Sequence, residues 1–461
     1  MFMICSIYLR GEHQRLLVYG LRNVDSGSSM QLSPKSYANA VEAAALIRKA
    51  EKPIRILRSL SWDPGIGQEF VKSGASKLPD VEYPKFDGSK SRRYLEKARV
   101  IGQGDHPVFA WLMRVADKLE LAGAMLEHTG TPEFYAHSKK LYGTPDALLL
   151  DKKTKTINLA RHMDATLADL DFDKLVLGGE EVELSACEFS EMLGDKLAKH
   201  FNGNAPKIVM SDNLSAKVLA GSRRIRVRKD ATFAPMDVHQ LLQHEALVHT
   251  ATALNGKAQD DFEILGAAHA GTTEIQEGLA VFAEFISGAM DPVRFRRLVD
   301  RVIAIQMSVE GADFIEVYKY FVGQNEEPYQ AFEDTRRVFR GGVLTGGAPF
   351  TKDGVYLNGL LRVHNFMRSV VSLNRADLVR LLFVGKLDLE DVPALANLAA
   401  NGKIKPAGFL PRWARDMRFL VSYLGYSSFL NQVKLPGLQE YYRHMLDEVP
   451  DIWDFHDEDE G

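Results

Sequence analysis

The chain has 461 residues, of which 46% are hydrophobic and 26% are charged. This balance is typical of a globular protein with a buried core, and it excludes large-scale disorder. Lys and Arg (57) nearly balance Asp and Glu (61), so the net charge of -4 gives no overall field that favours nucleic acid or an anionic membrane. We therefore expect neither of them as a partner.

Cysteine usage and the first residues indicate a cytoplasmic protein. Cys5 and Cys187 lie far apart, which excludes a disulfide framework and a thiolate zinc site. The start of the chain is apolar but lacks the basic residues of a signal peptide. No stretch reaches the roughly 18 apolar residues of a membrane-spanning helix. Residues 1–30 differ in character from the rest of the chain, and Met30 could be the native start.

The N-terminal part of the chain is predicted to be mostly helical. Apolar residues recur at helical spacing over residues 36–58 and predict a helix. Residues 62–92 are rich in proline and glycine and predict a loop-rich connector. Helical spacing returns over residues 91–128, where we expect a helical hairpin.

The pattern changes near residue 207. Apolar and charged residues alternate with period two over 207–210 and 224–233, which predicts two strands. A long apolar helix is predicted over about 236–254, ended by the capping pair Asn255-Gly256. Another helix is predicted from about Thr272 to Ile286.

Beyond residue 291 the pattern is again mostly helical, interrupted by a glycine-rich loop at 340–349. We predict five regions along the chain: a poorly defined segment (1–35), a mostly helical region (36–205), a catalytic core with the strands and two motif-bearing helices (206–345), a helical region that completes the cleft (346–450) and an acidic tail (451–461).

The segment His244-Glu245-Ala-Leu-Val-His249 carries the first chemical motif. Its two histidines lie five positions apart, whereas the zinc motif H-E-x-x-H places them four apart. In a regular α-helix, positions five apart point about 140° away from each other, so two ligands of one ion would not converge. A π-bulge absorbs one extra residue in a turn and is frequent at functional sites. We therefore predict a π-bulge between His244 and His249.

A second motif supplies the third ligand that zinc needs. In the histidine–histidine–glutamate class, the glutamate lies on a second helix downstream, and one position stays open for water. Glu277 lies in such a helix, within the sequence Gln-Glu-Gly-Leu-Ala. The small residues Gly278 and Ala280 would let this helix approach the first one closely.

Other polar residues near these helices are weaker candidates. Glu274 and Glu284 share about the same helix face as Glu277, either as alternative ligands or as hydrogen-bond partners of a histidine. His239 lies at the start of the first helix, where a capping or surface role is the plainer interpretation. His269 precedes the second helix and could reach the cleft, but a structural role is again the plainer one.

Glu245 is the candidate general base, because it adjoins the first ligand and could move a proton from water to a leaving amine. The strand over 224–233 could pair with an extended peptide. Together these parts describe peptide hydrolysis. Taken alone, the histidines of H-E-x-x-x-H could also be ordinary surface or core residues of a helix.

The two motifs together resemble the microtubule-associated tyrosine carboxypeptidase family and its bacterial relatives, labelled flavohaemoglobin expression-modulating QEGLA-motif proteins. Similarity runs from about Ser36 to the C-terminal region. It includes Arg337-Val-Phe-Arg-Gly-Gly342 and Phe350-Thr-Lys-Asp-Gly-Val-Tyr-Leu-Asn-Gly359 as further family blocks.

The resemblance implies a mainly α (α+β) fold, with a gluzincin-like metallopeptidase core, a small β-sheet and flanking helical regions. It implies that His244, His249 and Glu277 bind Zn2+ and that Glu245 is catalytic. In characterised eukaryotic members the reaction removes a C-terminal tyrosine from α-tubulin. For this chain we expect a peptide or protein C-terminus as the substrate, of open identity.

A carboxypeptidase must also recognise a terminal carboxylate, which requires a cation near the metal. Lys352, Arg337 and Arg340 are the candidates, although each could be an ordinary surface or structural charge. Tyr356 could donate a hydrogen bond to the oxyanion, or it could be a core residue.

Two other functions are compatible with the sequence. One is a regulatory protein without peptidase activity, as the label of the bacterial relatives suggests. The other is a zinc amidohydrolase that acts on a non-peptide amide, because the same water-activating site would serve. The oligomeric state is not predicted.

Overall fold

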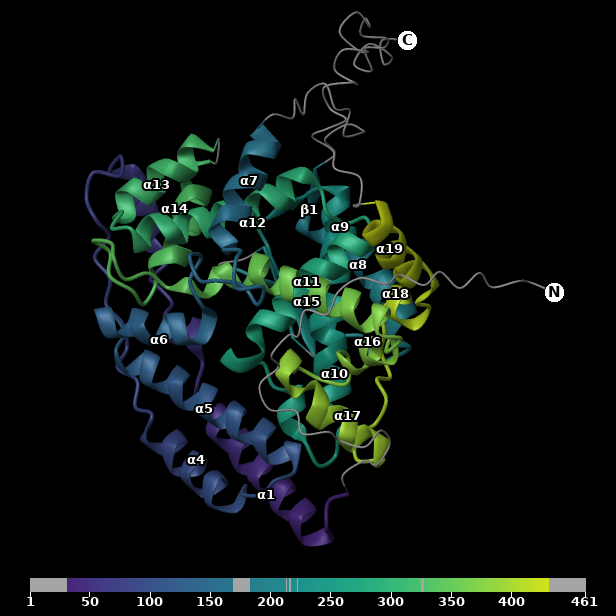
Figure 1. The fold of residues 1–461 in the computed structure, drawn as a ribbon. Helices are drawn as coiled ribbons and strands as arrows, with labels where there is room; N and C mark the ends of the chain where they lie inside the picture. Colours follow the sequence, from purple (N-terminus) through teal and green to yellow (C-terminus); the bar gives the residue numbers. More distant parts are fainter. Residues whose placement is uncertain are drawn as a thin grey trace, which may run out of the picture.

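The computed structural model describes residues 31–168, 183–212, 214, 217–221, 223–324 and 327–430. The predicted Met30 start, Cys5 and the acidic tail at 451–461 lie outside this range. Within it the chain is mainly helical with two small sheets, as expected (Figure 1). None of the described helices is long and apolar enough to cross a membrane.

The N-terminal helices form one layer of the molecule, in purple and blue in Figure 1. They are α1 (Pro34–Glu51), α4 (Ser89–Ile101), α5 (Pro107–Glu127) and α6 (Pro132–Tyr142), and α1 packs against both α4 and α5. The predicted hairpin is therefore confirmed as α4 and α5. The predicted first helix ends earlier, at Glu51, and the short α2 (Ile56–Ser59) follows it.

The connector predicted as a loop contains a helix, α3 (Gly65–Lys72). Its local sequence is rich in helix breakers, but Phe70 is buried and packs its ring against Phe314, Tyr318 and Phe332. Tertiary packing thus overrides the weak local propensity of this segment.

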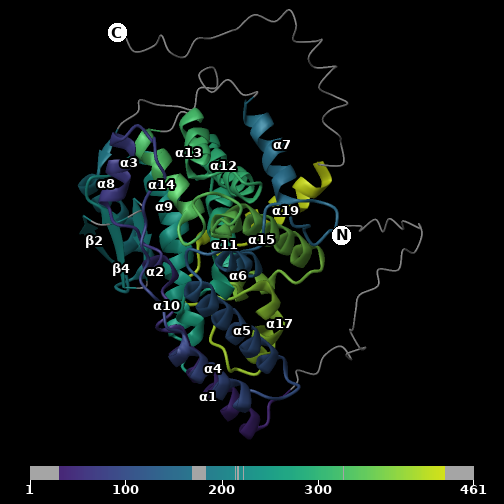
Figure 2. The same ribbon diagram turned by 90° about the vertical axis from the view of Figure 1, so that its left-hand side faces the viewer.

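The larger sheet has three strands in the order β2 (Lys207–Ser211), β4 (Arg224–Arg228), β3 (Val218–Ala220). β2 runs parallel to β4, and β3 runs antiparallel to it. The smaller sheet pairs β1 (Leu184–Ser185) with β5 (Thr232–Phe233). Figure 2 shows the larger sheet at one side of the molecule beside α8 (Ala186–Phe201), which packs against β2 and β4.

The prediction that segment 224–233 pairs with a peptide is wrong. The segment divides into β4 and β5, and β4 is the central strand, so both of its edges are already hydrogen-bonded. The strand β3, which the sequence did not predict, has the free edge on the side of the motif-bearing helix.

The first motif lies on a continuous run of helix that changes type twice. It consists of α9 (Pro235–Leu241), the π-helix η1 (Leu242–Thr250) and α10 (Ala251–Lys257). The predicted stop at Asn255-Gly256 is wrong. The Asn255 amide donates to the carbonyls of Phe383 and Phe409, and Gly256 packs so tightly that a Cβ would lie 2.2 Å from the Leu265 carbonyl oxygen. Both residues serve tertiary contacts inside the helix.

The second motif lies on α11 (Thr273–Ile286), which crosses α15 (Val355–Ser372) at the centre of Figure 1. A Cβ built on Gly278 would lie 2.2 Å from the carbonyl carbon of Gly359. The expectation that Gly278 admits the first motif-bearing helix is therefore wrong, because this glycine admits α15.

The remaining elements confirm the predicted helical C-terminal part and its glycine-rich interruption. Before the interruption lie α7 (Thr156–Ala168), η2 (Glu263–Gly266), η3 (Ala270–Thr272), α12 (Pro292–Val309), α13 (Phe314–Gly323) and α14 (Pro328–Phe339). After it lie η4 (Thr351–Gly354), α15, α16 (Asp377–Leu381), η5 (Leu389–Asp391), α17 (Val392–Ala400), α18 (Arg412–Arg415) and α19 (Arg418–Leu430). The largest apolar core joins residues of α1, α5, α11, α15 and α17, so it braces the second motif from several sides.

Candidate metal centre

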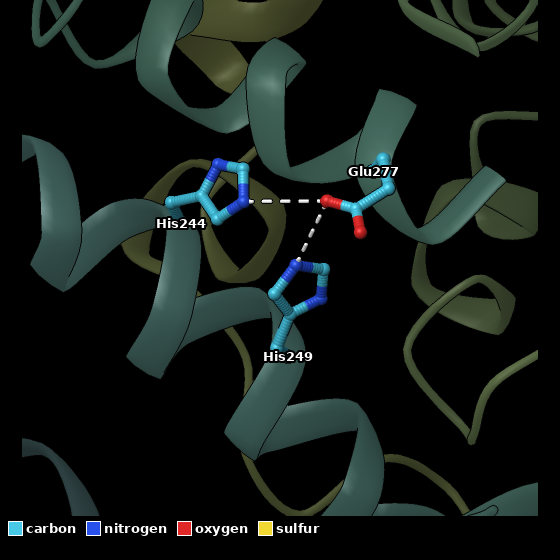
Figure 3. A group of neighbouring side chains, drawn as sticks. All are labelled: His244, His249 and Glu277. Carbon is cyan, nitrogen blue, oxygen red and sulfur yellow. Dashed lines mark ion pairs between the residues drawn. The ribbon is translucent and has the colours of Figure 1, made fainter. Parts of the chain in front are cut away.

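Three side chains from the two motifs converge between η1 and α11 (Figure 3). His244 Nε2 and His249 Nε2 lie 3.5 and 3.4 Å from the same oxygen, Oε2 of Glu277. The three ligand atoms lie within 4.8 Å of one another. Among the described residues, this is the one group of three or more histidine, cysteine or carboxylate side chains that could hold a metal ion.

The π-helix explains how histidines five positions apart can converge. Its hydrogen bonds run from i to i+5 and each turn holds more residues than a turn of an α-helix, so positions five apart come back close to the same face. The imidazole ring centres of His244 and His249 lie 4.9 Å apart. The predicted π-bulge is confirmed, and it extends over the nine residues Leu242–Thr250.

The geometry of the three donors fits a zinc ion. Zinc–nitrogen and zinc–oxygen bonds of about 2.0–2.1 Å in a tetrahedral site separate neighbouring ligand atoms by about 3.3 Å. The two histidine–glutamate separations, 3.4 and 3.5 Å, are close to that value, and all three donor atoms lie within 4.8 Å of one another. The two separations are also longer than an ordinary hydrogen bond, which leaves room for a cation between the donors.

A buried carboxylate orients the first histidine. Glu284 is fully buried, and its Oε1 lies 2.5 Å from His244 Nδ1. The same carboxylate accepts two hydrogen bonds from Arg294 and one from Gln240, at 3.0 to 3.1 Å. Because Nδ1–H donates to Glu284, Nε2 is the ring nitrogen that faces Glu277. Of the two glutamates weighed from the sequence, Glu284 is the partner of a histidine, whereas Glu274 bonds to Asn358 and Arg362.

The group carries opposed charges. Burial alone would lower the pKa of His244, but the carboxylates of Glu277 and Glu284 raise it to about 10. Burial would raise the pKa of Glu277, but Lys352 and the two histidines hold it well below its usual range. Glu277 is therefore ionised, and a cation between the three donors would replace the proton of His244.

The backbone of β3 holds the candidate base. Glu245 is half-buried, and its Oε2 accepts a hydrogen bond of 3.2 Å from the Ala220 amide. A groove of about 440 Å³ runs along this strand, lined by Leu219, Ala220, Gly221, Arg223, Arg224 and Arg226. Sequence reasoning missed β3 because three residues carry too short a pattern to be recognised.

The structure places one of the four substrate-binding candidates beside the candidate metal ligands. Lys352 is buried, and its Nζ lies 3.8 Å from Oε1 of Glu277. Tyr356 lies next to Lys352, whose Nζ is 5.5 Å from the centre of the tyrosine ring.

The two arginine candidates lie further from the metal ligands. Arg337 donates to Oδ2 of Asp353 at 2.5 Å, and Oδ1 of Asp353 lies 4.0 Å from Lys352 Nζ. Arg340 is buried with its guanidinium 5.8 Å from the ring centre of Phe350. A chain of alternating charges thus leads from Glu277 through Lys352 and Asp353 to Arg337.

The two remaining histidines do not join the metal group. His239 pairs with Gln243 on the same helix at 3.3 Å, and His269 is buried just ahead of η3. Burial lowers the pKa of His269 to about 4, so it is neutral at pH 7.

Sequence reasoning also missed Lys386. Its buried Nζ donates to Oε1 of Gln276 at 2.8 Å and lies 3.4 Å from the hydroxyl of Thr252. It therefore ties α10, which follows His249 in the chain, to α11, which carries Glu277. No local pattern marks this residue, because its role depends on two distant helices.

The fold and the site together define a mainly helical protein with a histidine–histidine–glutamate group set beside a small sheet. A family model, microtubule-associated tyrosine carboxypeptidase, matches residues 68–432 and so includes both motifs. The chain belongs to this family, and the predicted resemblance is confirmed. A search of curated proteins found no match. The name of the family describes a carboxypeptidase, that is, a hydrolase that acts on the C-terminal residue of a protein.

Proposed function

We propose that this protein is a zinc-dependent carboxypeptidase with a gluzincin-like core. The observation that carries the proposal is the convergence of His244, His249 and Glu277, with Glu245 adjoining the first ligand. The family to which the chain belongs supports the carboxypeptidase reaction.

The residues present suit the hydrolysis of a peptide bond. Bound between the three ligands, zinc would polarise the scissile carbonyl and lower the pKa of a water molecule. Glu245 would accept a proton from this water and deliver it to the leaving amine. The Ala220 amide holds the Glu245 carboxylate in place for both transfers.

The free edge of β3 is the element best placed to hold the substrate backbone. Its Ala220 amide already points at Glu245, so a chain paired with this edge would pass the candidate base.

Lys352 is the proposed partner of the terminal carboxylate. It is the cation nearest to the metal ligands among the candidates, at 3.8 Å from Glu277. Tyr356 packs beside it, and we assign the tyrosine to the support of Lys352. An ammonium group at this place would distinguish a chain end from an internal peptide bond.

Peptides that differ only in their last residue, with C-terminally amidated copies, test this function. We expect release of the last residue from the free acids, and a rate at least tenfold lower for the amidated copies, because they lack the anion that Lys352 would bind. Equal cleavage of the amidated copies would exclude carboxypeptidase specificity and favour a broader amidohydrolase. A zinc-loaded protein that cleaves no peptide would favour the regulatory function.

A further inference from the structure

The larger sheet has a buried face and an exposed face. On the buried face, Ile225 and Val227 of β4 join an apolar core, and α8 packs against β2 and β4 (Figure 2). The alternate residues of the three strands point to the other face and are exposed. Together with the exposed residue before β4, we call them the basic face: Lys207, Val209, Leu219, Arg223, Arg224 and Arg226.

The strand register brings the side chains of the basic face close together. Arg226 lies between its cross-strand neighbours Val209 and Leu219, and Lys207 pairs with Arg224. Neighbouring strands lie about 4.8 Å apart, and residues two apart in one strand lie about 7 Å apart, so the cations form one patch. The groove of about 440 Å³ beside β3 is lined by four residues of this face: Leu219, Arg223, Arg224 and Arg226.

The charge of this region is unbalanced. Residues 207–230 contain seven lysines and arginines but only two aspartates, and both aspartates pair with cations outside the basic face, Arg228 and Lys229. If Glu245, which β3 holds, is counted as a third carboxylate, four positive charges are left over. Within the described part of the chain, no side-chain hydrogen bond or ion pair engages the four cations of the basic face.

The complementary chemistry lies in the acidic tail of the same chain. Residues 451–460 contain six aspartates and glutamates and no lysine or arginine. They also contain the aromatic residues Trp453 and Phe455, whereas Val209 and Leu219 of the basic face are 38% and 39% exposed. Both the carboxylates and the apolar side chains of this segment therefore have counterparts on the basic face.

The acidic tail is tethered closely enough to reach the basic face. The helix α19 ends at Leu430, and 20 residues separate it from Asp451. A chain of this length spans up to about 70 Å when extended. A compact protein of this size has a radius of gyration of about 23 Å, so the tether can bring the tail to any side of the molecule.

We propose that residues 451–460 bind the basic face of their own chain and cover the groove beside β3. Ala220 lines this groove and donates its amide hydrogen to Glu245, so the bound tail would limit access to the candidate base. Single exposed ion pairs are weak, but several act together here, and the tether keeps the tail at an effective concentration in the millimolar range. The docking is independent of the proposed function, whereas its effect on catalysis rests on that function.

Zero-length crosslinking with a carbodiimide tests the docking on the unaltered protein, because Lys207 is the lysine of the basic face. We expect mass spectrometry to find Lys207 joined to a carboxylate of residues 451–460 within one chain at low salt. The yield should fall at least fivefold in 0.5 M salt, where the Debye length shrinks to about 4 Å. Absence of this crosslink, with the tail joined to other lysines, to a second chain or to nothing, would overturn the inference.

A matched pair of variants locates the binding surface. Arg224→Gln combined with Arg226→Gln should reduce the yield of the Lys207 crosslink at least fivefold. The control combines Arg375→Gln with Arg418→Gln, which removes the same charge from exposed arginines that pair with nearby aspartates, and it should retain the crosslink. Equal yields in the two double variants would show that the basic face does not hold the tail.

The effect on catalysis is measured with an uncharged peptide substrate at low salt. In the comparison protein, each aspartate of residues 451–460 is replaced by asparagine and each glutamate by glutamine. We expect kcat/KM to rise about threefold or more, mainly through a lower KM, and the difference to vanish in 0.5 M salt. An unchanged kcat/KM in a protein that forms the Lys207 crosslink would refute the covering of the groove. Inactivity of both proteins would refute the proposed function and leave the crosslink to decide the docking.

Discussion

Two groups of side chains meet at Glu277: the candidate metal ligands His244 and His249 at its Oε2, and Lys352 with the neighbouring arginines at its Oε1. Their buried polar atoms are satisfied to different degrees. On the side of Oε2, Glu284 pairs with His244, Gln240 and Arg294, so the histidine is fixed before any ligand arrives. On the side of Oε1, hydrogen-bond partners are missing among the described residues for the buried Nε atoms of Arg301, Arg336 and Arg340 and for Oδ1 of Asp353. Paired groups such as His244 and Glu284 hold a fixed geometry, whereas a buried polar atom without a partner carries an uncompensated cost of desolvation.

The largest effect on stability and metal binding is expected from a change where α11 crosses α15, because this crossing fixes the position of Glu277. Gly278→Ala would place a Cβ 2.2 Å from the backbone of Gly359, so α11 must shift and carry Glu277 with it. We expect a loss of about 3 kcal/mol or more in the free energy of unfolding, together with loss of bound zinc. Urea unfolding and metal analysis check this. Gly288→Ala is the control, because no atom lies within 4 Å of the added Cβ and only the positive φ of 73° adds a small cost in stability. Unchanged zinc content in Gly278→Ala would show that the crossing does not position Glu277.

A change at Glu284 should weaken metal binding rather than abolish folding. Glu284→Gln keeps the shape of the side chain but removes the charge that orients His244 and neutralises Arg294. We expect zinc affinity to fall by about 10–100-fold, as measured by competition with a chelator. An affinity within twofold of the unaltered protein would contradict the described role of this carboxylate.

Two neighbouring arginines at the C-terminal end of α14 provide a matched pair. Arg337→Met leaves the buried Asp353 without its partner and should lower the free energy of unfolding by about 3–5 kcal/mol. Arg340→Met removes an unpaired buried charge and should change stability by at most about 1 kcal/mol, with stabilisation as the expected sign. Equal losses in the two variants, measured in the absence of substrate, would show that Arg340 has a structural partner.

The smallest effect is expected at Lys386. Its neutral partners Gln276 and Thr252 need the ammonium donor less than a carboxylate would. Lys386→Met should cost about 1–2 kcal/mol of stability and reduce kcat by less than tenfold. A reduction of kcat beyond a hundredfold, with zinc retained, would place Lys386 among the groups that act on the substrate.

The convergence of the candidate site residues was predictable because they lie in two short segments. The spacing of His244 and His249 even predicted the π-helix, since a regular helix could not bring both to one ion. The partners of these residues were not predictable in the same way. Arg294 reaches Glu284, Lys386 reaches Gln276 and the edge strand β3 reaches Glu245 only after the chain has folded, and no periodic pattern encodes such contacts.

The fold shows the same division between local and tertiary information. The helices α4, α5 and α11 follow from apolar periodicity, which their own residues carry. The helix α3 and the continuation of α10 past Asn255 do not, because Phe70 and Asn255 are fixed by contacts with distant segments. For the same reason, the sequence did not show that Gly278 packs against α15 rather than against the first motif-bearing helix.

The most direct test of the central claim is the zinc content of the protein purified without chelators. About one zinc per chain is expected in the unaltered protein and in Glu245→Gln, whose peptidase activity should fall by about 10²–10⁴. His249→Ala, which removes one of the three donors, should contain none. A protein without zinc, or a His249→Ala variant that binds zinc as tightly as the unaltered protein, would contradict the account.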